Sequence, residues 1–237
     1  MVFRTALRPV VSAVALLASA TAWGLAAPAH AQSDSDFQAW SALFFSGKPV
    51  EDSRLLLWFD GHARFSDDAS QLGVSIIRPG LGWRVNDDLD LWAGYARVVS
   101  RTDGAPNVEE NRIWQQATYP VPSLFGGSLS GRTRLEQRLR ETGEDTGWRL
   151  RQFFRWERRF EGSTLSPVIA NEVFVSFNDA DWGQQSGFDQ NRLFVGGAWR
   201  VTEKVRLEGG YLNNILNTAG PGTQTNHNVF VNLFLSL

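Results

Sequence analysis

The chain has 237 residues, with 23 lysines and arginines against 25 aspartates and glutamates, so its net charge of −2 provides no basic surface for nucleic acid. It contains no cysteine, which excludes disulfides, thiolate nucleophiles and thiolate metal ligands. Its three histidines show no H-E-x-x-H or comparable spacing, and we expect neither a metal nor a cofactor.

Residues 1–31 have the features of a cleaved secretory signal peptide. Arg4 and Arg8 provide a positively charged start, and the apolar stretch 10–17 is too short to cross a bilayer as a helix. Ala29-His30-Ala31 supplies the small-x-small cleavage site. We therefore predict export across the inner membrane, with residues 32–237 forming a single mature domain.

The mature chain reads as β-strands from end to end, because apolar and polar residues alternate with a period of two. Many of these segments are longer than the strands of ordinary globular proteins, and their length suits a tilted strand that crosses a bilayer. The segments are 37–46, 53–65, 71–85, 88–99, 111–120, 128–141, 147–160, 164–178, 188–201, 205–216 and 226–237.

The connections between these segments alternate between long and short. Residues 100–110, 178–187 and 217–225 form long loops, whereas 86–87 and 202–204 form short turns. Bacterial outer-membrane barrels combine short periplasmic turns with longer extracellular loops. The prediction is an all-β fold, a closed antiparallel transmembrane β-barrel of about ten to twelve strands, located in the bacterial outer membrane.

The strand count conflicts with this topology. If the last strand ends in the periplasm, counting back places the start of segment 37–46 on the outer side, whereas an even-stranded barrel would start in the periplasm. Two interpretations remain open: one strand is miscounted, or residues 37–46 thread or cap the lumen of a ten-stranded wall.

Charged residues occupy every second position between residues 128 and 160. In a membrane barrel the apolar row, with Leu135, Leu139, Leu150 and Phe154, faces lipid and the charged row faces the lumen. The charged residues that we predict to line the lumen, there and on other strands, are Arg78, Arg132, Arg134, Glu136, Arg138, Arg140, Arg149, Arg151, Arg155, Glu157, Glu172 and Arg192.

Two details of the wall can be predicted from the same alternation. Val74 and Ile76 are out of phase with the outward row, which indicates a bulge or a partly apolar lumen. Gln137 and Gln152 would face each other on the lipid side and could form a cross-strand pair.

The final segment alternates apolar residues up to Leu237, a pattern similar to the terminal strand of outer-membrane barrels, although that signal usually ends in an aromatic residue. A soluble β-sandwich would instead bury the apolar rows between two sheets and expose the arginines. Composition alone permits that alternative.

Several segments together resemble a known family. They are Arg78-Pro79-Gly80-Leu81, Arg112-Ile113-Trp114-Gln115-Gln116, Arg132-Thr133-Arg134-Leu135-Glu136-Gln137-Arg138, Ser166-Pro167 with Asn171-Glu172-Val173-Phe174, and Phe188-Asp189-Gln190-Asn191-Arg192-Leu193. In this order they resemble the uncharacterised outer-membrane β-barrel family called domain of unknown function 2490. The resemblance implies a Gram-negative outer membrane and implies no activity.

We expect a structural role, or a narrow passive pore whose arginine-rich lumen prefers anions. The expected partners are outer-membrane lipid and lipopolysaccharide, the barrel-assembly machinery during insertion, and small anionic solutes; we expect a monomer. One alternative is an outer-membrane lipid hydrolase or deacylase using His227 near Asn213 and Asn214, but no serine is well placed and we predict no catalytic residues. The other alternative is a soluble periplasmic β-sandwich that binds a ligand.

Overall fold

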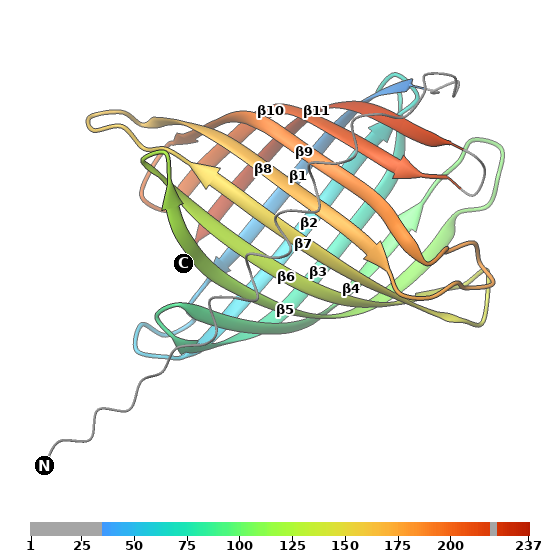
Figure 1. Cartoon of the computed structure of the whole chain (residues 1–237), viewed down its shortest axis with the longest axis horizontal. Coiled ribbons are helices and arrows are strands. Elements are labelled where there is room, and N and C mark those ends of the chain that lie inside the picture. The colour runs from blue at the N-terminus through green and yellow to red at the C-terminus, as the bar shows by residue number, and fades with distance from the viewer. Residues whose placement is uncertain (1–34, 219–221) are drawn as a thin grey trace, which may run out of the picture. The chain divides into compact units, whose positions relative to one another are not determined.

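The computed structural model describes residues 35–218 and 222–237, and this part of the chain forms eleven strands in one closed barrel (Figure 1). The predicted signal peptide lies outside the described residues. The strands are β1 (Ser35–Gly47), β2 (Leu55–Ser66), β3 (Gln71–Asn86), β4 (Leu89–Ser100), β5 (Val108–Leu124), β6 (Gly127–Arg140), β7 (Thr146–Glu157), β8 (Leu165–Ser176), β9 (Gly187–Arg200), β10 (Val205–Asn217) and β11 (Thr223–Ser236). The predicted all-β barrel is confirmed, and the two-sheet sandwich is wrong because the sheet closes on itself.

The barrel closes through a parallel pair. Consecutive strands pair antiparallel, and β1 completes the ring by pairing antiparallel with β2 and parallel with β11, with Trp40 opposite Phe230. Both interpretations of residues 37–46 are wrong, since eleven strands are present and β1 belongs to the wall. An odd number of alternating strands must contain one parallel neighbour, so the prediction of an entirely antiparallel barrel is corrected at this seam.

The two ends of the barrel differ in their connections (Figure 1). One end, here called the turn end, carries residues 48–54, 87–88, 125–126, 158–164 and 201–204 together with the C-terminus. The other, the loop end, carries residues 67–70, 101–107, 141–145, 177–186 and the connection that follows Asn217. Within the described residues, no helix is long and apolar enough to cross a membrane.

The residues of β3 that were out of phase point into an apolar part of the interior, and a bulge lies next to them. The pairing of β2 with β3 shifts between Arg64, opposite Val74, and Phe65, opposite Leu72. Beyond this shift Ile76 points inward and is only 2% exposed. The bulge and the partly apolar interior, which the sequence presented as alternatives, therefore occur together.

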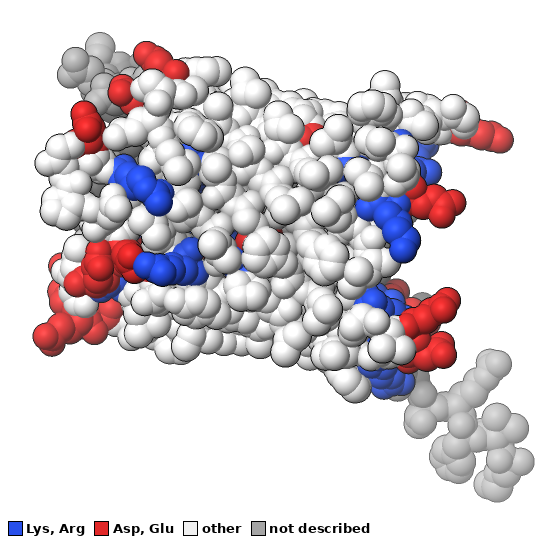
Figure 2. All heavy atoms as spheres, turned by 180° about the vertical axis from the view of Figure 1, so that it is seen from behind, with Lys and Arg blue, Asp and Glu red and all other residues white. Residues whose placement is uncertain are grey.

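The outer surface between the two ends is mainly uncharged. In the face shown in Figure 2, charged side chains gather toward the ends of the barrel. Exposed aliphatic side chains of the middle region include Ile77, Leu81, Ile113, Ile169, Val195 and Val231. Exposed aromatic residues lie toward both ends of the strands: Phe37, Trp148, Phe177 and Phe188 toward the loop end, and Trp83, Phe125, Phe160 and Trp199 toward the turn end.

One predicted pair on this surface is wrong. Gln137 exchanges side-chain hydrogen bonds with Gln115 of β5, at 3.0 and 3.1 Å, and not with Gln152. The register of the β6–β7 hairpin places Trp148 opposite Gln137 and Thr133 opposite Gln152.

The interior holds two separate apolar clusters. The first, on β1 and β8–β10, consists of Trp40, Val168, Ala170, Phe194, Ala198 and Leu212. The second, on β2–β5, consists of Leu56, Ile76, Trp92, Ala96, Val98 and Trp114. Trp114 is fully buried and lies against Gly80 and Gly94, where a Cβ on either glycine would clash with the indole. These clusters leave the charged residues to meet between them.

Candidate functional site: an arginine-rich interior

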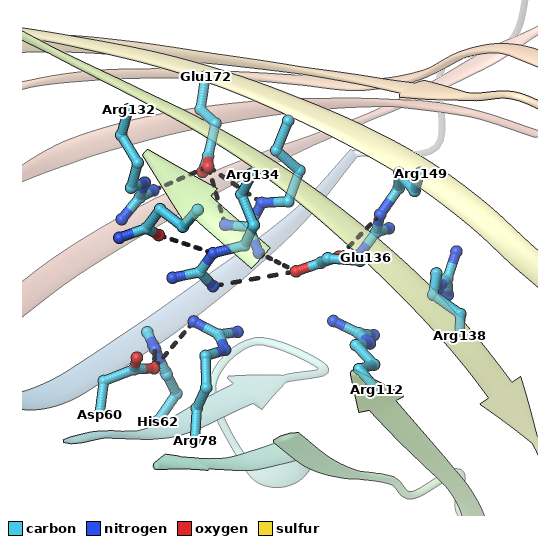
Figure 3. Close-up of polar contacts among 12 residues, drawn as sticks. Asp60, His62, Arg78, Arg112, Arg132, Arg134, Glu136, Arg138, Arg149 and Glu172 are labelled. Carbon is cyan, nitrogen blue, oxygen red and sulfur yellow. Dashed lines mark hydrogen bonds and ion pairs between the residues drawn. The ribbon is translucent and has the colours of Figure 1, made fainter. Parts of the chain in front are cut away.

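Glu136 on β6 is the centre of the interior charge network (Figure 3). Its side chain has no exposed surface, and its two carboxylate oxygens accept hydrogen bonds from Arg149 and Arg151 on β7, both at 2.6 Å. Arg134 lies 3.9 Å away and donates its Nε hydrogen to Gln116 at 2.8 Å. Because a carboxylate can accept several charge-assisted hydrogen bonds, this one side chain holds the two strands together from inside.

Glu172 on β8 extends the network. It accepts hydrogen bonds from Arg132 of β6 and Arg151 of β7, both at 2.8 Å. Arg151 therefore bridges two carboxylates, Glu136 and Glu172, and strands β6, β7 and β8 share one continuous set of ion pairs.

A second group lies on β2 and β3. Asp60 is fully buried and accepts hydrogen bonds from Arg78 at 2.9 Å and from the indole of Trp58 at 2.5 Å. The Nε2 atom of His62 lies 2.6 Å from the same carboxylate. These partners come from β2 and β3, and Figure 3 shows Asp60 with His62 and Arg78.

Toward the loop end, carboxylates satisfy the arginines closely. Glu110 pairs with Arg112 and with Arg138, each at 2.6 Å. Arg149 forms its second ion pair with Asp189 at 2.8 Å. Each arginine of this group therefore has a carboxylate within hydrogen-bonding distance.

Residues 177–186 cover this end of the interior. Arg138 donates a hydrogen bond to Gln184 at 3.1 Å, and its guanidinium lies 4.9 Å from the ring centroid of Trp182. Gln184 is only 6% exposed although it lies in a loop. Arg140 also contacts Trp182, at 5.9 Å from the ring centroid.

The same loop is tied to residues 141–145 by aspartates. The carboxylate of Asp181 accepts hydrogen bonds from the backbone amides of Glu144 at 2.8 Å and Asp145 at 3.2 Å, and these bonds hold its pKa below the usual value. Asp145 in turn accepts a bond from the amide of Asp181 at 3.0 Å. Among residues 35–218 and 222–237, no group of three or more acidic or histidine side chains is arranged to hold a metal ion.

At the turn end, Arg155 of β7 joins distant strands. It pairs with Glu157 on its own strand and with Glu208 on β10, both at 2.7 Å. Glu157 is 4% exposed and also accepts a hydrogen bond from Ser166 at 2.8 Å.

Besides Arg140, which lies against Trp182 at the loop end, two arginines deeper in the interior form no ion pair with any described carboxylate. They are Arg64 on β2 and Arg192 on β9, and both guanidiniums lie against the indole of Trp40, at 4.1 and 5.1 Å from its centroid. Arg192 donates a hydrogen bond to Gln190 at 2.9 Å, whereas the buried Nε of Arg64 has no partner within the described chain.

Two cavities of the described barrel lie toward opposite ends of the interior, with buried side chains between them. A cavity of about 580 Å³ lies toward the turn end, and one of about 160 Å³ lies toward the loop end beneath Trp182. They share no lining residue. Between them lie Arg134 and Glu136, which have no exposed surface, with Trp114.

The charged side chains predicted to line the lumen are thus divided among these groups. Arg78, Arg132, Arg151, Arg155, Glu172 and Arg192 line the larger cavity, and Arg138 and Arg140 line the smaller one. Arg134, Glu136 and Arg149 lie buried outside both cavities, and Glu157 is buried beneath Arg155. Their assignment as a solute path stays a prediction.

Sequence reasoning missed several members of the site. Trp40, Trp58 and Trp114 receive arginine guanidiniums inside the barrel, and Trp182 covers its loop end. Trp40, Trp58 and Trp114 have the same parity on their strands as the inward charges, which is the signal that would have placed them.

His227 lies on the outer surface and is exposed. Its Nδ1 atom is 2.6 Å from the hydroxyl of Tyr211, and Asn213 donates to that hydroxyl at 3.4 Å. Asn214, by contrast, faces inward and is 2% exposed. The three residues considered for a hydrolase are therefore not on one side of the wall.

The fold and site together define a closed β-barrel whose interior is crossed by arginine–carboxylate pairs. A family model described as "Protein of unknown function (DUF2490)" matches residues 37–226, so the chain belongs to this family, as its motifs predicted. An uncharacterised protein of Methylorubrum extorquens is 36% identical over 225 residues, covering 93% of this chain and 96% of the relative.

Proposed function

We propose that this protein is an outer-membrane β-barrel with a structural role and an interior that is closed to ions. The single observation that carries the proposal is a charged interior inside an uncharged outer belt, because this is the inverse of a water-soluble protein.

The outer belt supports a membrane location. Water-soluble monomers rarely expose a continuous apolar surface, yet here aliphatic side chains such as Val195 and Ile169 stand next to each other at mid-barrel, 48% and 45% exposed. Exposed aromatic residues toward both ends of the strands match the two interfacial girdles of membrane barrels.

The buried layer supports a closed interior. Arg134 and Glu136 are fully buried between the two cavities, and arginine–carboxylate contacts join β6, β7 and β8 across this level. Barrels of about eight strands are filled by side chains, whereas those of about 16 strands leave a channel. This barrel has eleven strands, and large side chains such as Trp114 and Arg134 fill the level between the two cavities.

The membrane location can be tested with a charge on the belt. Val195→Arg places a charge between Ile169 and Tyr211 on neighbouring strands, whereas Val50→Arg places the same charge in the turn before β2. In a bilayer the first change costs about 2–4 kcal/mol and the second little. We expect Val195→Arg alone to reduce recovery of heat-modifiable barrel in the outer-membrane fraction. Equal recovery of both variants, or a wild-type protein in the soluble periplasmic fraction, would contradict the proposal.

The closed interior can be tested by conductance in planar bilayers. We expect no steady current from the wild-type protein, since the two cavities share no lining residue. The second candidate is the narrow anion-preferring pore, favoured by the surplus arginines Arg64 and Arg192. A steady anion-selective current would support that pore in place of the closed barrel.

Several further properties remain predictions. They are the contact with lipopolysaccharide, the assembly machinery, the monomeric state, the cleaved signal and the lack of enzymatic activity. Lipid turnover by the purified protein that is lost in His227→Ala would contradict the last of them.

A further inference from the structure

The larger cavity is a built pocket, and it ends inside the barrel. Its volume of about 580 Å³ lies within the range of small-molecule sites. The turn residues Asp87 and Asp88 line it at the turn end, and Arg78 and Arg151 of the interior network line it at depth.

The deep part of the cavity carries positive charge that the protein does not neutralise. Arg64 and Arg192 both line it, and neither forms an ion pair with a carboxylate of the described residues. Both guanidiniums lie on the indole of Trp40, so the two positive charges converge on one ring. Two unpaired, partly buried cations are costly to fold, and an anion held between them would remove that cost.

Apolar side chains form a large part of the remaining wall of the cavity, which also includes Arg155, Arg206 and Glu208. Phe153, Phe194, Leu212, Phe230 and Phe234 line it, and they come from strands β7, β9, β10 and β11. An inorganic anion would leave this surface without a partner. A ligand that matches the whole cavity has one anionic group and one apolar chain.

We propose that this cavity binds a single-chain anionic amphiphile, with its carboxylate or phosphate headgroup between Arg64 and Arg192 and its chain along the apolar wall toward the turn end. Arginine is suited to this role because its planar guanidinium forms paired hydrogen bonds with carboxylate and phosphate oxygens. The proposal concerns the cavity alone, so it goes beyond the proposed membrane role and can fail independently of it.

Binding is to be measured by calorimetry on the full mature barrel in neutral nanodiscs, with the heat of empty nanodiscs subtracted. The probes are dodecanoate and dodecyl phosphate, which share a chain and differ in headgroup. Octanoate tests the effect of chain length, and dodecyltrimethylammonium tests the sign of the headgroup charge. Inorganic phosphate tests a headgroup without a chain.

We expect dodecanoate or dodecyl phosphate to bind saturably, and the tighter of the two identifies the headgroup. Octanoate should bind at least about tenfold more weakly because fewer methylene groups are buried. Arg64→Gln and Arg192→Gln should each raise the dissociation constant at least about tenfold. Arg140→Gln, which removes an arginine from the loop-end cavity, is the matched control and should bind as the wild type does.

Ala170→Phe tests the cavity without changing its charge. Ala170 lines the pocket and is 7% exposed, so a phenyl group there should weaken dodecanoate binding while the barrel keeps its heat-modifiable migration. Equal affinity for dodecyltrimethylammonium, inorganic phosphate binding as tight as dodecyl phosphate, no binding of either anionic amphiphile, or unchanged affinity in folded Arg64→Gln and Arg192→Gln would overturn the proposal.

Discussion

The arginines at the loop end of the interior differ in their ion pairing from those in the larger cavity. At the loop end, Arg112 and Arg138 share the carboxylate of Glu110, and residues 177–186 cover them. Arg64 and Arg192 instead line the deep part of the cavity that extends toward the turn end, and no carboxylate of the described residues forms an ion pair with either. The loop-end arginines are therefore mostly held in ion pairs, with Arg140 as the exception, whereas the deep part of the larger cavity carries two unpaired arginines.

This difference suggests a structural role for the paired arginines and a binding role for the unpaired ones. Paired arginines with full hydrogen bonding fix the register of neighbouring strands, and they leave no capacity for a ligand. Unpaired buried charges weaken the fold, and such local conflicts are expected where a protein binds something. Glu136 lies between the two cavities and lines neither of them.

The largest effect is expected from removing the carboxylate that lies between the two cavities. Glu136→Gln removes the negative charge that Arg149 and Arg151 share in a fully buried position and replaces one of its two acceptor oxygens with an NH2 donor. Breaking a buried ion pair from one side costs about 3–5 kcal/mol, so the free energy of unfolding in urea should fall by about that amount.

The control is Glu109→Gln on the outer surface. Glu109 pairs with Arg97, and their side chains are 37% and 55% exposed. An exposed pair contributes at most about 1 kcal/mol. If both variants lose the same stability, the central network does not hold the barrel.

An intermediate effect is expected from removing a paired arginine at the loop end, and no loss of stability from removing an unpaired arginine deep in the larger cavity. Arg138→Gln leaves Glu110 without its bidentate partner and should lower the free energy of unfolding by about 2–3 kcal/mol. Arg64→Gln removes an unpaired buried charge and should leave it unchanged or raise it by about 1 kcal/mol. Equal destabilisation by the two changes, measured in the same urea titration, would mean that the two groups of arginines do not differ as described.

The smallest effect is expected at the cover of the loop end. The pKa of Asp181 lies below its usual value of 3.8 because its carboxylate accepts the amides of Glu144 and Asp145. A lowered carboxylate pKa means that this contact is fully present above about pH 4 and is lost as the pH falls through the folded-state value.

Amide hydrogen exchange at Glu144 and Asp145, corrected for intrinsic rates, should therefore be constant from neutral pH to about pH 5 and accelerate in stronger acid. Asp181→Asn should accelerate it already at neutral pH. The amide of Ala105, bonded to the carbonyl of Thr102 at 3.1 Å, is the control because no carboxylate takes part. Parallel acid acceleration at Ala105 would point to general fraying of the loop end.

Much of the fold follows from the sequence because a period of two is a local property. The alternation around Arg134 and Leu135 assigns each residue to a face without knowledge of its neighbours on other strands. The parallel seam does not follow, since nothing in segment 37–46 specifies whether it pairs with β11 or lies within the lumen. The position of Gln137 shows the same limit, because its partner depends on a register set by the whole ring.

The residue types of the site could be predicted from the sequence, but the ion pairs that these residues form could not. The parity of Arg151 and Glu172 places both inside, but only the closed barrel shows that they meet at 2.8 Å. Arg64 and Arg192 are 128 positions apart in the chain and contact one indole only because the β1–β11 seam closes the ring and brings β2 and β9 to opposite sides of β1. Which arginines remain without a carboxylate partner therefore depends on how the closed barrel brings the strands together.

The parallel seam has a consequence for how the barrel and its cavity come into being. Strands β2–β11 can be grouped as successive hairpins, each joined at the loop end, and β1 is the strand left without such a partner. It also carries Trp40, the ring on which the two unpaired arginines converge. The contact that closes the cylinder and the ring at the centre of the proposed anion pocket therefore belong to the same strand. A ligand that binds only the complete pocket would, by mass action, favour the joined seam over a ring that is still open.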